Sequence, residues 1–317
     1  MKQQQQQQGQ TKRKVDSKVT LKSMVMGTRP WSLTAAFSSV LVGSALAFRE
    51  THTFDLVTFI IVTVGAISTQ CFANLINSYY DFKFGVDKKE TSDDRTMFDY
   101  GLSERLVTRM IYFFISVCLM SLIALCYKIN HIPVITESLL PLVLVGALLS
   151  IFYTAAPVSL KYIGLGDVAI TTCFGPLLVQ AAFLAQTNFT HTIAYYYSLP
   201  IGLTIEAILH VNNTRDIKFD KLNGGFTLAT ILGETGCYYV YILLYLIAYA
   251  FNYLLSIQPN GKMIMNLPVI LLPMLLKLFK EFKERKYASL CEKTGQFSFL
   301  FGGLYAIGIL LSTEVST

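Results

Sequence analysis

Residues 55–80 read DLVTFIIVTVGAISTQCFANLINSYY, and this stretch decides the fold class. After Asp55 it contains no acidic or basic residue, whereas a helix needs about 20 apolar residues to cross a bilayer core of about 30 Å. The stretch is too long, and alternates too little, to be a strand of a membrane barrel. It therefore predicts a transmembrane helix whose last turns, from Asn74 onward, are polar.

Similar apolar stretches recur along the 317-residue chain, which is 53% hydrophobic and only 15% charged. Soluble domains carry about 25% charged residues. We predict nine spans at residues 31–48, 55–80, 107–127, 138–155, 167–187, 193–212, 236–257, 264–279 and 296–312. With their loops they occupy residues 29–317 as one membrane domain. The sequence thus predicts an all-α, polytopic membrane protein of about nine transmembrane helices in the lipid bilayer.

Residues 1–28 have a different character. They contain a glutamine run, Gln3–Gln8, followed by the basic run Lys12–Lys14. Such a polar, low-complexity segment is expected to be disordered. It lacks the apolar stretch and small-residue cleavage site of a signal peptide, so we expect the first span to direct insertion and to remain in the mature protein.

The positions of the basic residues predict the orientation. Of the 26 Lys and Arg residues, 23 precede the first span or lie in loops on that side, and the other side has Arg49, Lys128 and Lys262. Cytosolic loops are enriched in basic residues, so the N-terminus is predicted to be cytosolic and the C-terminus to face the other way. The net charge of +6 then needs no nucleic-acid partner. The organelle stays open between endoplasmic reticulum, Golgi and mitochondrion.

Two polar clusters lie at cytosolic helix ends. If the second span continues as a helix, Asn77 and Asp81 share one face, and Gly85 permits a turn that returns Asp87 to the same point. The sixth span ends with a second cluster of the same form, made of Asn212, Asp216 and Asp220. Oxygen-only ligand sets of this kind suit a hard cation, and Mg²⁺ is usually held by a few carboxylates plus substrate phosphates.

Basic residues are interleaved with both acidic clusters: Lys83, Lys88, Lys89, Arg95, Arg215 and Lys218. A metal–diphosphate complex needs positive charge around its anionic oxygens, whereas a site for a metal alone does not. Solvated loop charges that form weak surface pairs are the simpler alternative. An acid inside a span is costly, so Glu206 is a further candidate for a cavity-facing residue. His210 lies just before the second cluster and is a candidate base.

At these residues the chain resembles the UbiA superfamily of intramembrane aromatic prenyltransferases. The matching motifs are Asn77-x3-Asp81-x5-Asp87, Asn212-x3-Asp216-x3-Asp220, the segment 153–167 (YTAAPVSLKYIGLGD) and Arg29–Leu33 (RPWSL). The segments 74–82 (NLINSYYDF), 92–96 (SDDRT) and 212–216 (NNTRD) look most like the menaquinone-forming branch and its eukaryotic members. The resemblance covers residues 25–312. The six-residue spacing of Asp81 and Asp87 departs from the superfamily's commoner four and is shared by that branch. Asp87 could therefore bind the metal directly or through a water molecule.

The resemblance implies a fold of nine helices around a central cavity that opens to the membrane. It implies that Mg²⁺ on the diphosphate is held by Asn77, Asp81, Asp87, Asn212, Asp216 and Asp220, with Asp81, Asp216 and Asp220 essential for catalysis. It implies that the diphosphate is contacted by Arg29, Arg95, Tyr153, Lys161 and Lys218. Tyr79 and Tyr80 are candidates to stabilise an allylic cation, and residues 82–106 are a candidate lid.

The implied reaction is the Mg²⁺-dependent transfer of a prenyl group, geranylgeranyl by expectation, from its diphosphate to a naphthohydroquinone, which gives a menaquinone. Alternatives are prenylation of 4-hydroxybenzoate for ubiquinone synthesis, a transporter, and a regulatory protein that binds prenyl diphosphate and membrane partners without turnover. A CDP-alcohol phosphotransferase would need an Asp-Gly-x2-Ala-Arg signature, which the sequence lacks.

Overall fold

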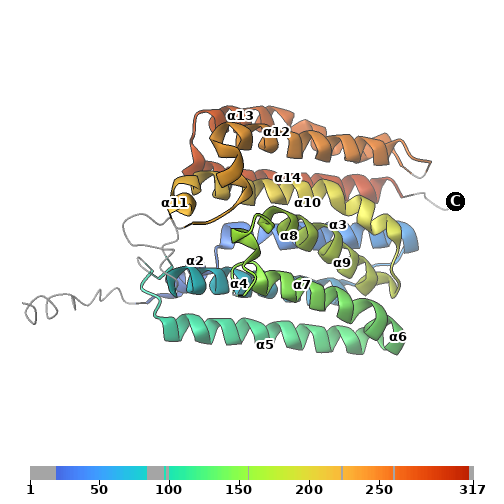
Figure 1. Cartoon of the computed structure of the whole chain (residues 1–317). Helices are drawn as coiled ribbons and strands as arrows, with labels where there is room; N and C mark the ends of the chain where they lie inside the picture. The colour runs from blue at the N-terminus through green and yellow to red at the C-terminus, as the bar shows by residue number, and fades with distance from the viewer. Residues whose placement is uncertain are drawn as a thin grey trace, which may run out of the picture.

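The computed structural model describes residues 19–83, 96–97, 100–155, 157–222, 224–259 and 261–313. The elements are α2 (Leu21–Gly27), η1 (Pro30–Ser32), α3 (Thr34–Thr51), α4 (Leu56–Lys83), α5 (Glu104–Ile129), α6 (Ile132–Val134), η2 (Ile135–Leu139), α7 (Leu140–Phe152), η3 (Leu160–Tyr162), α8 (Gly166–Thr172), η4 (Cys173–Leu177), α9 (Leu178–Thr187), α10 (Thr192–Arg215), α11 (Ile217–Leu222), α12 (Leu228–Ser256), η5 (Met263–Leu271), α13 (Leu272–Lys283) and α14 (Tyr287–Leu311). The long helices run side by side as one bundle (Figure 1).

In the described residues, eight helical segments are long and apolar enough to cross a membrane. The remaining predicted span corresponds to α10, which has 24 residues but carries polar groups such as Glu206 and His210 along its length. Each predicted span therefore has a helix. The prediction of an all-α, multi-pass membrane protein with about nine spans is confirmed.

Several spans are not uniform α-helices. The fourth and fifth contain π-helical turns, η2 and η4, and the second of these includes Pro176. Proline has no N–H to donate, and a local π turn is one way in which a membrane helix accommodates it. The eighth span begins as the 3₁₀ helix η5 before it becomes α13. In α12, Gly233 has φ 66° and ψ 173°, a backbone conformation essentially restricted to glycine.

Close packing holds the helices together where side chains are small. A Cβ added to Gly43 of α3 would lie 2.4 Å from the carbonyl oxygen of Val179 in α9, so the two backbones nearly touch. Small residues permit such close approach in membranes, where packing rather than burial from water drives helix association. On the other side of α10, large aromatic side chains such as Tyr241 and Phe297 fill the space between α12, α13 and α14.

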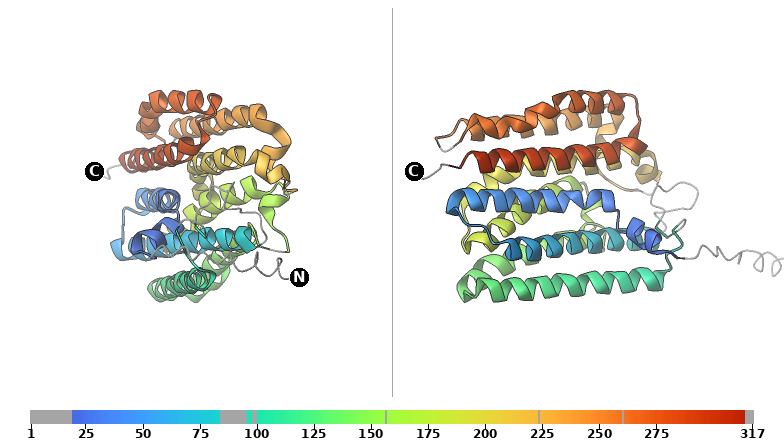
Figure 2. Two further views of the ribbon diagram at one scale, coloured as in Figure 1. Left: turned by 90° about the vertical axis from the view of Figure 1, so that its left-hand side faces the viewer. Right: turned by 180° about the vertical axis from the view of Figure 1, so that it is seen from behind.

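The ends of the bundle differ. Figure 1 shows α2 and α11 at one end, and the last turns of α14 at the opposite end; the left view of Figure 2 looks onto the first of these. We call it the site end. There Asn74 of α4 donates a hydrogen bond to the Thr28 carbonyl (2.8 Å), which ties the turn after α2 to α4. Helix α2 lies within residues 1–28, the segment that the sequence predicts as a disordered tail. Residues 1–18 of that segment lie outside the described residues.

Candidate active site

A cavity of about 1110 Å³ enters the bundle from the site end. It lies mainly between α4, α5, α7 and the span formed by α8, η4 and α9, with α10 and α11 on its remaining side. Its polar wall at the site end includes Arg29, Asn77, Asp81, Tyr153, Lys161, Asn212, Arg215, Asp216 and Asp220. Away from this end the wall is mostly apolar, with Ile61, Val62, Ala66, Leu122, Leu139, Leu142, Val143, Gly146, Phe174 and Leu177.

The first polar cluster joins the end of α4 to the loop before α8. Asp81 lies in the last turn of α4 and is buried. Its Oδ1 accepts a hydrogen bond from the Tyr162 hydroxyl (2.7 Å), and its Oδ2 lies 3.7 Å from the Lys161 Nζ. Ser159 starts the short η3 helix in a left-handed conformation (φ 47°), and η3 carries both Lys161 and Tyr162. Asp81 therefore lies beside a largely buried cation, and both side chains belong to the polar wall of the cavity.

The second cluster lies where α10 passes into α11. Asp216 ends α10, yet its N–H donates to the Asn212 carbonyl (3.1 Å) and the Asp220 N–H donates to the Asp216 carbonyl (2.9 Å). The helical hydrogen bonds thus continue through the junction, and Asn212, Asp216 and Asp220 all line the cavity. The Arg215 guanidinium donates to both oxygens of Asp216, at 2.9 and 3.1 Å. The predicted stripe of polar residues is present at the predicted end of the bundle.

The charges of the two clusters act on each other. Burial raises the pKa of Asp220 to about 6, the negative charges of Asp216 and Asp81 act in the same direction, and the positive charge of Lys161 opposes them. Among the described residues, neither Asp220 Oδ2 nor Asn77 Oδ1 has a hydrogen-bond partner, although both atoms are buried. Buried oxygens that lack donors are costly, and a carboxylate-rich, oxygen-only set is the kind that binds Mg²⁺. The residues present therefore fit a hard divalent cation.

Other residues predicted for the diphosphate fall into three groups. Arg29 and Tyr153 line the cavity; Arg29 has a left-handed backbone (φ 55°) and reaches Ser78 Oγ at 3.4 Å. Lys218 lies on α11 but is exposed and does not line the cavity. Asp87 and Arg95 lie outside the described residues, as does most of the candidate lid, so their roles remain predictions.

Tyr153 and Lys161 are linked through the backbone. The Lys161 N–H donates to the Tyr153 carbonyl (2.9 Å), and the Tyr153 hydroxyl is buried without a hydrogen-bond partner among the described residues. A Cβ added to Gly166 would lie 3.3 Å from the Tyr153 ring. The segment 153–167 thus folds back on itself and presents both side chains to the cavity.

Some residues of this region were not found from the sequence. Tyr162 lies within the motif 153–167, which does not itself indicate a role for this residue, and its hydroxyl is the direct partner of Asp81. Cys291 of α14 lines the cavity, and its thiol donates to Asn212 Oδ1 (2.7 Å); no local pattern marks this cysteine. Glu206, Tyr79 and Tyr80 are not among the cavity-lining residues.

The geometry agrees with the result of a family comparison. A model described as the UbiA prenyltransferase family matches residues 36–302. The chain belongs to this family. The resemblance seen in the motifs is thereby confirmed, the chain is a UbiA-family prenyltransferase, and the transporter alternative is dropped.

Curated relatives of this prenyltransferase cover most of its length. It is 52% identical over 294 residues to UbiA prenyltransferase domain-containing protein 1 of Dictyostelium discoideum, covering 93% of this chain and 89% of the relative. To the Homo sapiens protein of the same name it is 33% identical, with 92% and 84% covered.

Solved UbiA structures share the fold. A UbiA homolog from Aeropyrum pernix K1 superimposes with a TM-score of 0.62 at 13% identity, covering 88% of this chain and 98% of that one. A UbiA homolog from Archaeoglobus fulgidus, solved with GPP and Mg²⁺, has a TM-score of 0.60 at 14% identity and covers 91% and 99%. At such low identity these structures support the fold of the prenyltransferase and no assignment of individual residues.

Proposed function

We propose that this chain transfers a prenyl group, with geranylgeranyl as the preferred donor, from an isoprenyl diphosphate to a naphthohydroquinone in an Mg²⁺-dependent reaction that forms a menaquinone. The observation that supports this most is the continuity of one cavity from the two acidic clusters to a long apolar wall. An isoprenyl diphosphate has the same division between a charged head and an apolar tail. The relative from Archaeoglobus fulgidus was solved with GPP and Mg²⁺, which fits this assignment.

The diphosphate head belongs at the site end in this proposal. Asn77, Asp81, Asn212, Asp216 and Asp220 hold Mg²⁺ there, with Asp87 as a sixth ligand from outside the described residues. The bound ion neutralises charge that develops on the leaving diphosphate as its C–O bond breaks. Lys161 adds a fixed positive charge beside Asp81, and Arg29, Tyr153 and Arg95 are proposed as further contacts. Lys218 is exposed outside the cavity, so it is not included among them.

The tail belongs along α4 and α7. Cavity-lining residues on α4 extend from Asp81 back to Ile61, a path of about 30 Å at about 1.5 Å per helical residue. Small side chains such as Ala66 and Gly146 leave the space that the tail needs. The surrounding apolar wall also keeps water from the allylic cation, which would otherwise be hydrolysed.

The acceptor assignment rests on the motif resemblance to the menaquinone branch and on the names of the curated relatives. A neutral naphthohydroquinone needs no cationic partner, whereas the carboxylate of 4-hydroxybenzoate does. The basic residues that line the cavity, Arg29, Lys161 and Arg215, lie at the site end among the acidic clusters. The apolar part of the wall therefore favours a neutral ring.

The test is a product assay in membranes that contain the expressed protein. Menadiol, 1,4-dihydroxy-2-naphthoate and 4-hydroxybenzoate are each supplied with geranyl, farnesyl and geranylgeranyl diphosphate, and products are identified by mass. We expect the highest kcat/KM with geranylgeranyl diphosphate and menadiol, the naphthohydroquinone that carries no carboxylate. A higher kcat/KM for 4-hydroxybenzoate would refute the acceptor and leave prenyl transfer intact. Diphosphate binding without any product would favour the regulatory alternative.

The orientation is proposed from charge. Tags at the two ends, probed with protease in sealed vesicles, should show opposite protection, with the N-terminal tag on the cytosolic side. Equal protection of both tags would contradict the proposed topology.

A further inference from the structure

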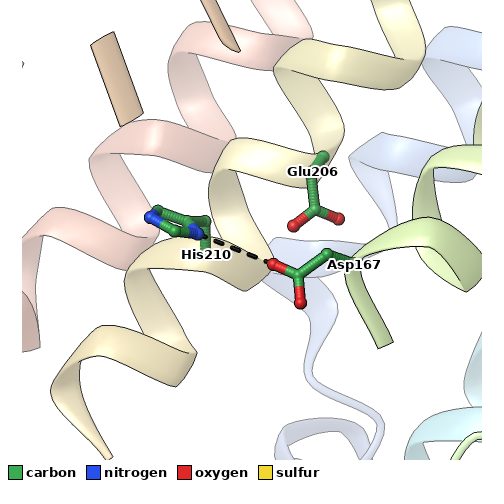
Figure 3. A group of neighbouring side chains, drawn as sticks. All are labelled: Asp167, Glu206 and His210. Carbon is green, nitrogen blue, oxygen red and sulfur yellow. Dashed lines mark ion pairs between the residues drawn. The ribbon is translucent and has the colours of Figure 1, made fainter. Parts of the chain in front are cut away.

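A second group of ionisable side chains lies outside the cavity. Asp167 is in the first turn of α8, and Glu206 and His210 are one turn apart on α10. One ligand atom from each lies within 4.8 Å of the other two, and Figure 3 shows the three side chains converging. None of the three lines the cavity. These three residues have no role in the prenyl-transfer reaction proposed above.

The hydrogen bonding of His210 defines its ring. Its Nε2 lies 2.9 Å from the Cys237 carbonyl oxygen, which can only accept, so Nε2 must carry a proton. In the neutral ring Nδ1 then carries a lone pair and no proton, and this atom faces the Asp167 carboxylate. A histidine whose other nitrogen donates to a backbone carbonyl is the usual arrangement of a metal-binding imidazole.

Glu206 has no partner that would explain its burial. Its side chain is 3% exposed, and among the described residues no group forms a hydrogen bond to either carboxylate oxygen. Buried carboxylates normally have a donor or a cation beside them. Its carboxyl group points toward Asp167 (Figure 3), so the group needs either protons held between its members or a bound cation.

The spacing of the ligand atoms leaves room for a shared cation. His210 Nδ1 and Asp167 Oδ1 are 3.6 Å apart, longer than the about 2.7–2.9 Å of a charge-assisted hydrogen bond. Two ligands bound at about 2.1 Å to one tetrahedral ion would be about 3.4 Å apart. The spacing of this pair is therefore close to that expected for two ligands of one ion, and the ligand atom of Glu206 lies within 4.8 Å of both. The Asp167 side chain is 14% exposed, so it is the most accessible of the three.

We propose that Asp167, Glu206 and His210 bind one divalent transition-metal ion, Zn²⁺ or an ion of similar size and ligand preference. Imidazole with carboxylates suits Zn²⁺, whereas oxygen-only sets suit Mg²⁺, so this site differs in chemistry from the acidic clusters of the cavity. Two carboxylates and a neutral imidazole carry the charge that a divalent ion neutralises. The ion joins α8 to α10, and its role is to hold these helices, which support Lys161 and Asn212, in place.

The test is metal binding by the purified, detergent-solubilised protein after chelator treatment. The background variant Asp81→Asn/Asp216→Asn/Asp220→Asn removes the carboxylates of the cavity, so that binding there does not contribute. We expect this variant to bind one equivalent of Zn²⁺, and Co²⁺ in its place to give the visible absorption bands of a tetrahedral site. Glu206→Gln or His210→Gln in the same background should weaken binding at least about 100-fold, because even outer-shell partners are worth about 10–100-fold.

Matched controls are Glu104→Gln and His131→Gln, which change exposed residues of the same types and should leave the bound equivalent unchanged. Zn²⁺ should also raise the Tm of the wild-type chain and not that of Glu206→Gln. If the background or the glutamine variants aggregate, Co²⁺ spectra of the wild-type protein test for the tetrahedral site instead. They are recorded with excess Mg²⁺, which occupies the carboxylates of the cavity. Absence of a tetrahedral Co²⁺ spectrum, or Zn²⁺ binding that is unchanged in Glu206→Gln, would overturn the proposal and leave a cluster neutralised by protons.

Discussion

The two sides of the bundle use their interior differently. Between α10, α12, α13 and α14, aromatic rings fill the space: Tyr245 and Phe297 meet edge to face with centroids 5.1 Å apart, and Tyr241 lies 4.7 Å from Phe282. We call this the filled side. Between α4, α5, α7 and α9 the interior positions hold mainly aliphatic residues, with small ones such as Ala66 and Gly146 among them, and the cavity occupies the space. We call this the hollow side.

The comparison shows how a chain of nearly uniform hydropathy can make a binding site. Hydropathy is high on both sides, because helices that contact lipid need apolar side chains. Side-chain volume differs, since protein interiors are close-packed unless small residues leave a void. The filled side is suited to stabilise the helix bundle, and the hollow side is suited to bind an apolar ligand. Four predictions test this division.

The largest effect is expected at the polar end of the hollow side. Asp81→Asn, Asp216→Asn and Asp220→Asn should each reduce kcat by about 100- to 1000-fold or more, because one lost transition-state contact is worth about 3–4 kcal/mol. Prenyl transfer to menadiol is measured with and without Mg²⁺. The control Glu104→Gln changes an exposed carboxylate of α5 and should retain full turnover. Near-normal turnover in two of the three variants would refute the metal assignment.

The next effect concerns the stability of the filled side. Phe297→Ala should lower the free energy of unfolding by about 3–5 kcal/mol, as expected when a fully packed ring is removed. Leu122→Ala, on the cavity wall, should cost much less because its side chain already borders empty space. Thermal unfolding in detergent measures both. Equal losses of Tm would show that the two sides are packed alike.

A third prediction fills the void. A Cβ added to Gly146 meets no atom within 4 Å, so Gly146→Phe should leave Tm nearly unchanged and project a ring into the cavity. We expect kcat/KM for geranylgeranyl diphosphate to fall by about 10- to 100-fold, the equivalent of about 1–3 kcal/mol of overpacking, and less for geranyl diphosphate.

The matched control for Gly146→Phe is Gly303→Phe on α14. Gly303 also has open space around it and does not line the cavity. Turnover of all donors should be normal in this variant. A similar loss for donors of every length in Gly146→Phe would contradict the placement of the tail.

The smallest effect is expected for Tyr162→Phe. The ring is kept, and only the hydroxyl that donates to Asp81 is lost. Outer-shell partners of metal ligands are worth about 10-fold or somewhat more in metal affinity, so the Mg²⁺ concentration for half-maximal rate should rise by about that factor. Saturating Mg²⁺ should restore kcat. A loss of kcat that Mg²⁺ does not restore would place Tyr162 in direct contact with substrate.

The sequence predicted what depends on local pattern. Spans follow from hydropathy, and Asn77 with Asp81, or Asn212 with Asp216 and Asp220, follow from helical spacing, which the structure reproduces at one end of the bundle. Contacts between distant segments could not be read in this way. Cys291 meets Asn212 from 79 residues away, and Asp167 meets His210 only because α8 packs on α10.

Lys218 is predicted to contact the diphosphate, but spacing alone could not tell on which face of the helix it lies, because that depends on where α10 ends. The helix terminates at Arg215, and α11 then turns Asp220 toward the cavity while Lys218 is exposed. Likewise, Glu206 could face either side of α10 from sequence alone. The packing of α8 decides that it lies against Asp167.

The most direct test of the account is an experimental structure with a non-hydrolysable geranylgeranyl thiodiphosphate and Mn²⁺ in place of Mg²⁺. We predict Mn²⁺ bound by oxygens of Asp81, Asp216 and Asp220, the thiodiphosphate beside Lys161, and the tail between α4 and α7 past Gly146. A tail bound against α12 and η5 on the filled side, or Mn²⁺ bound away from all three aspartates, would contradict it.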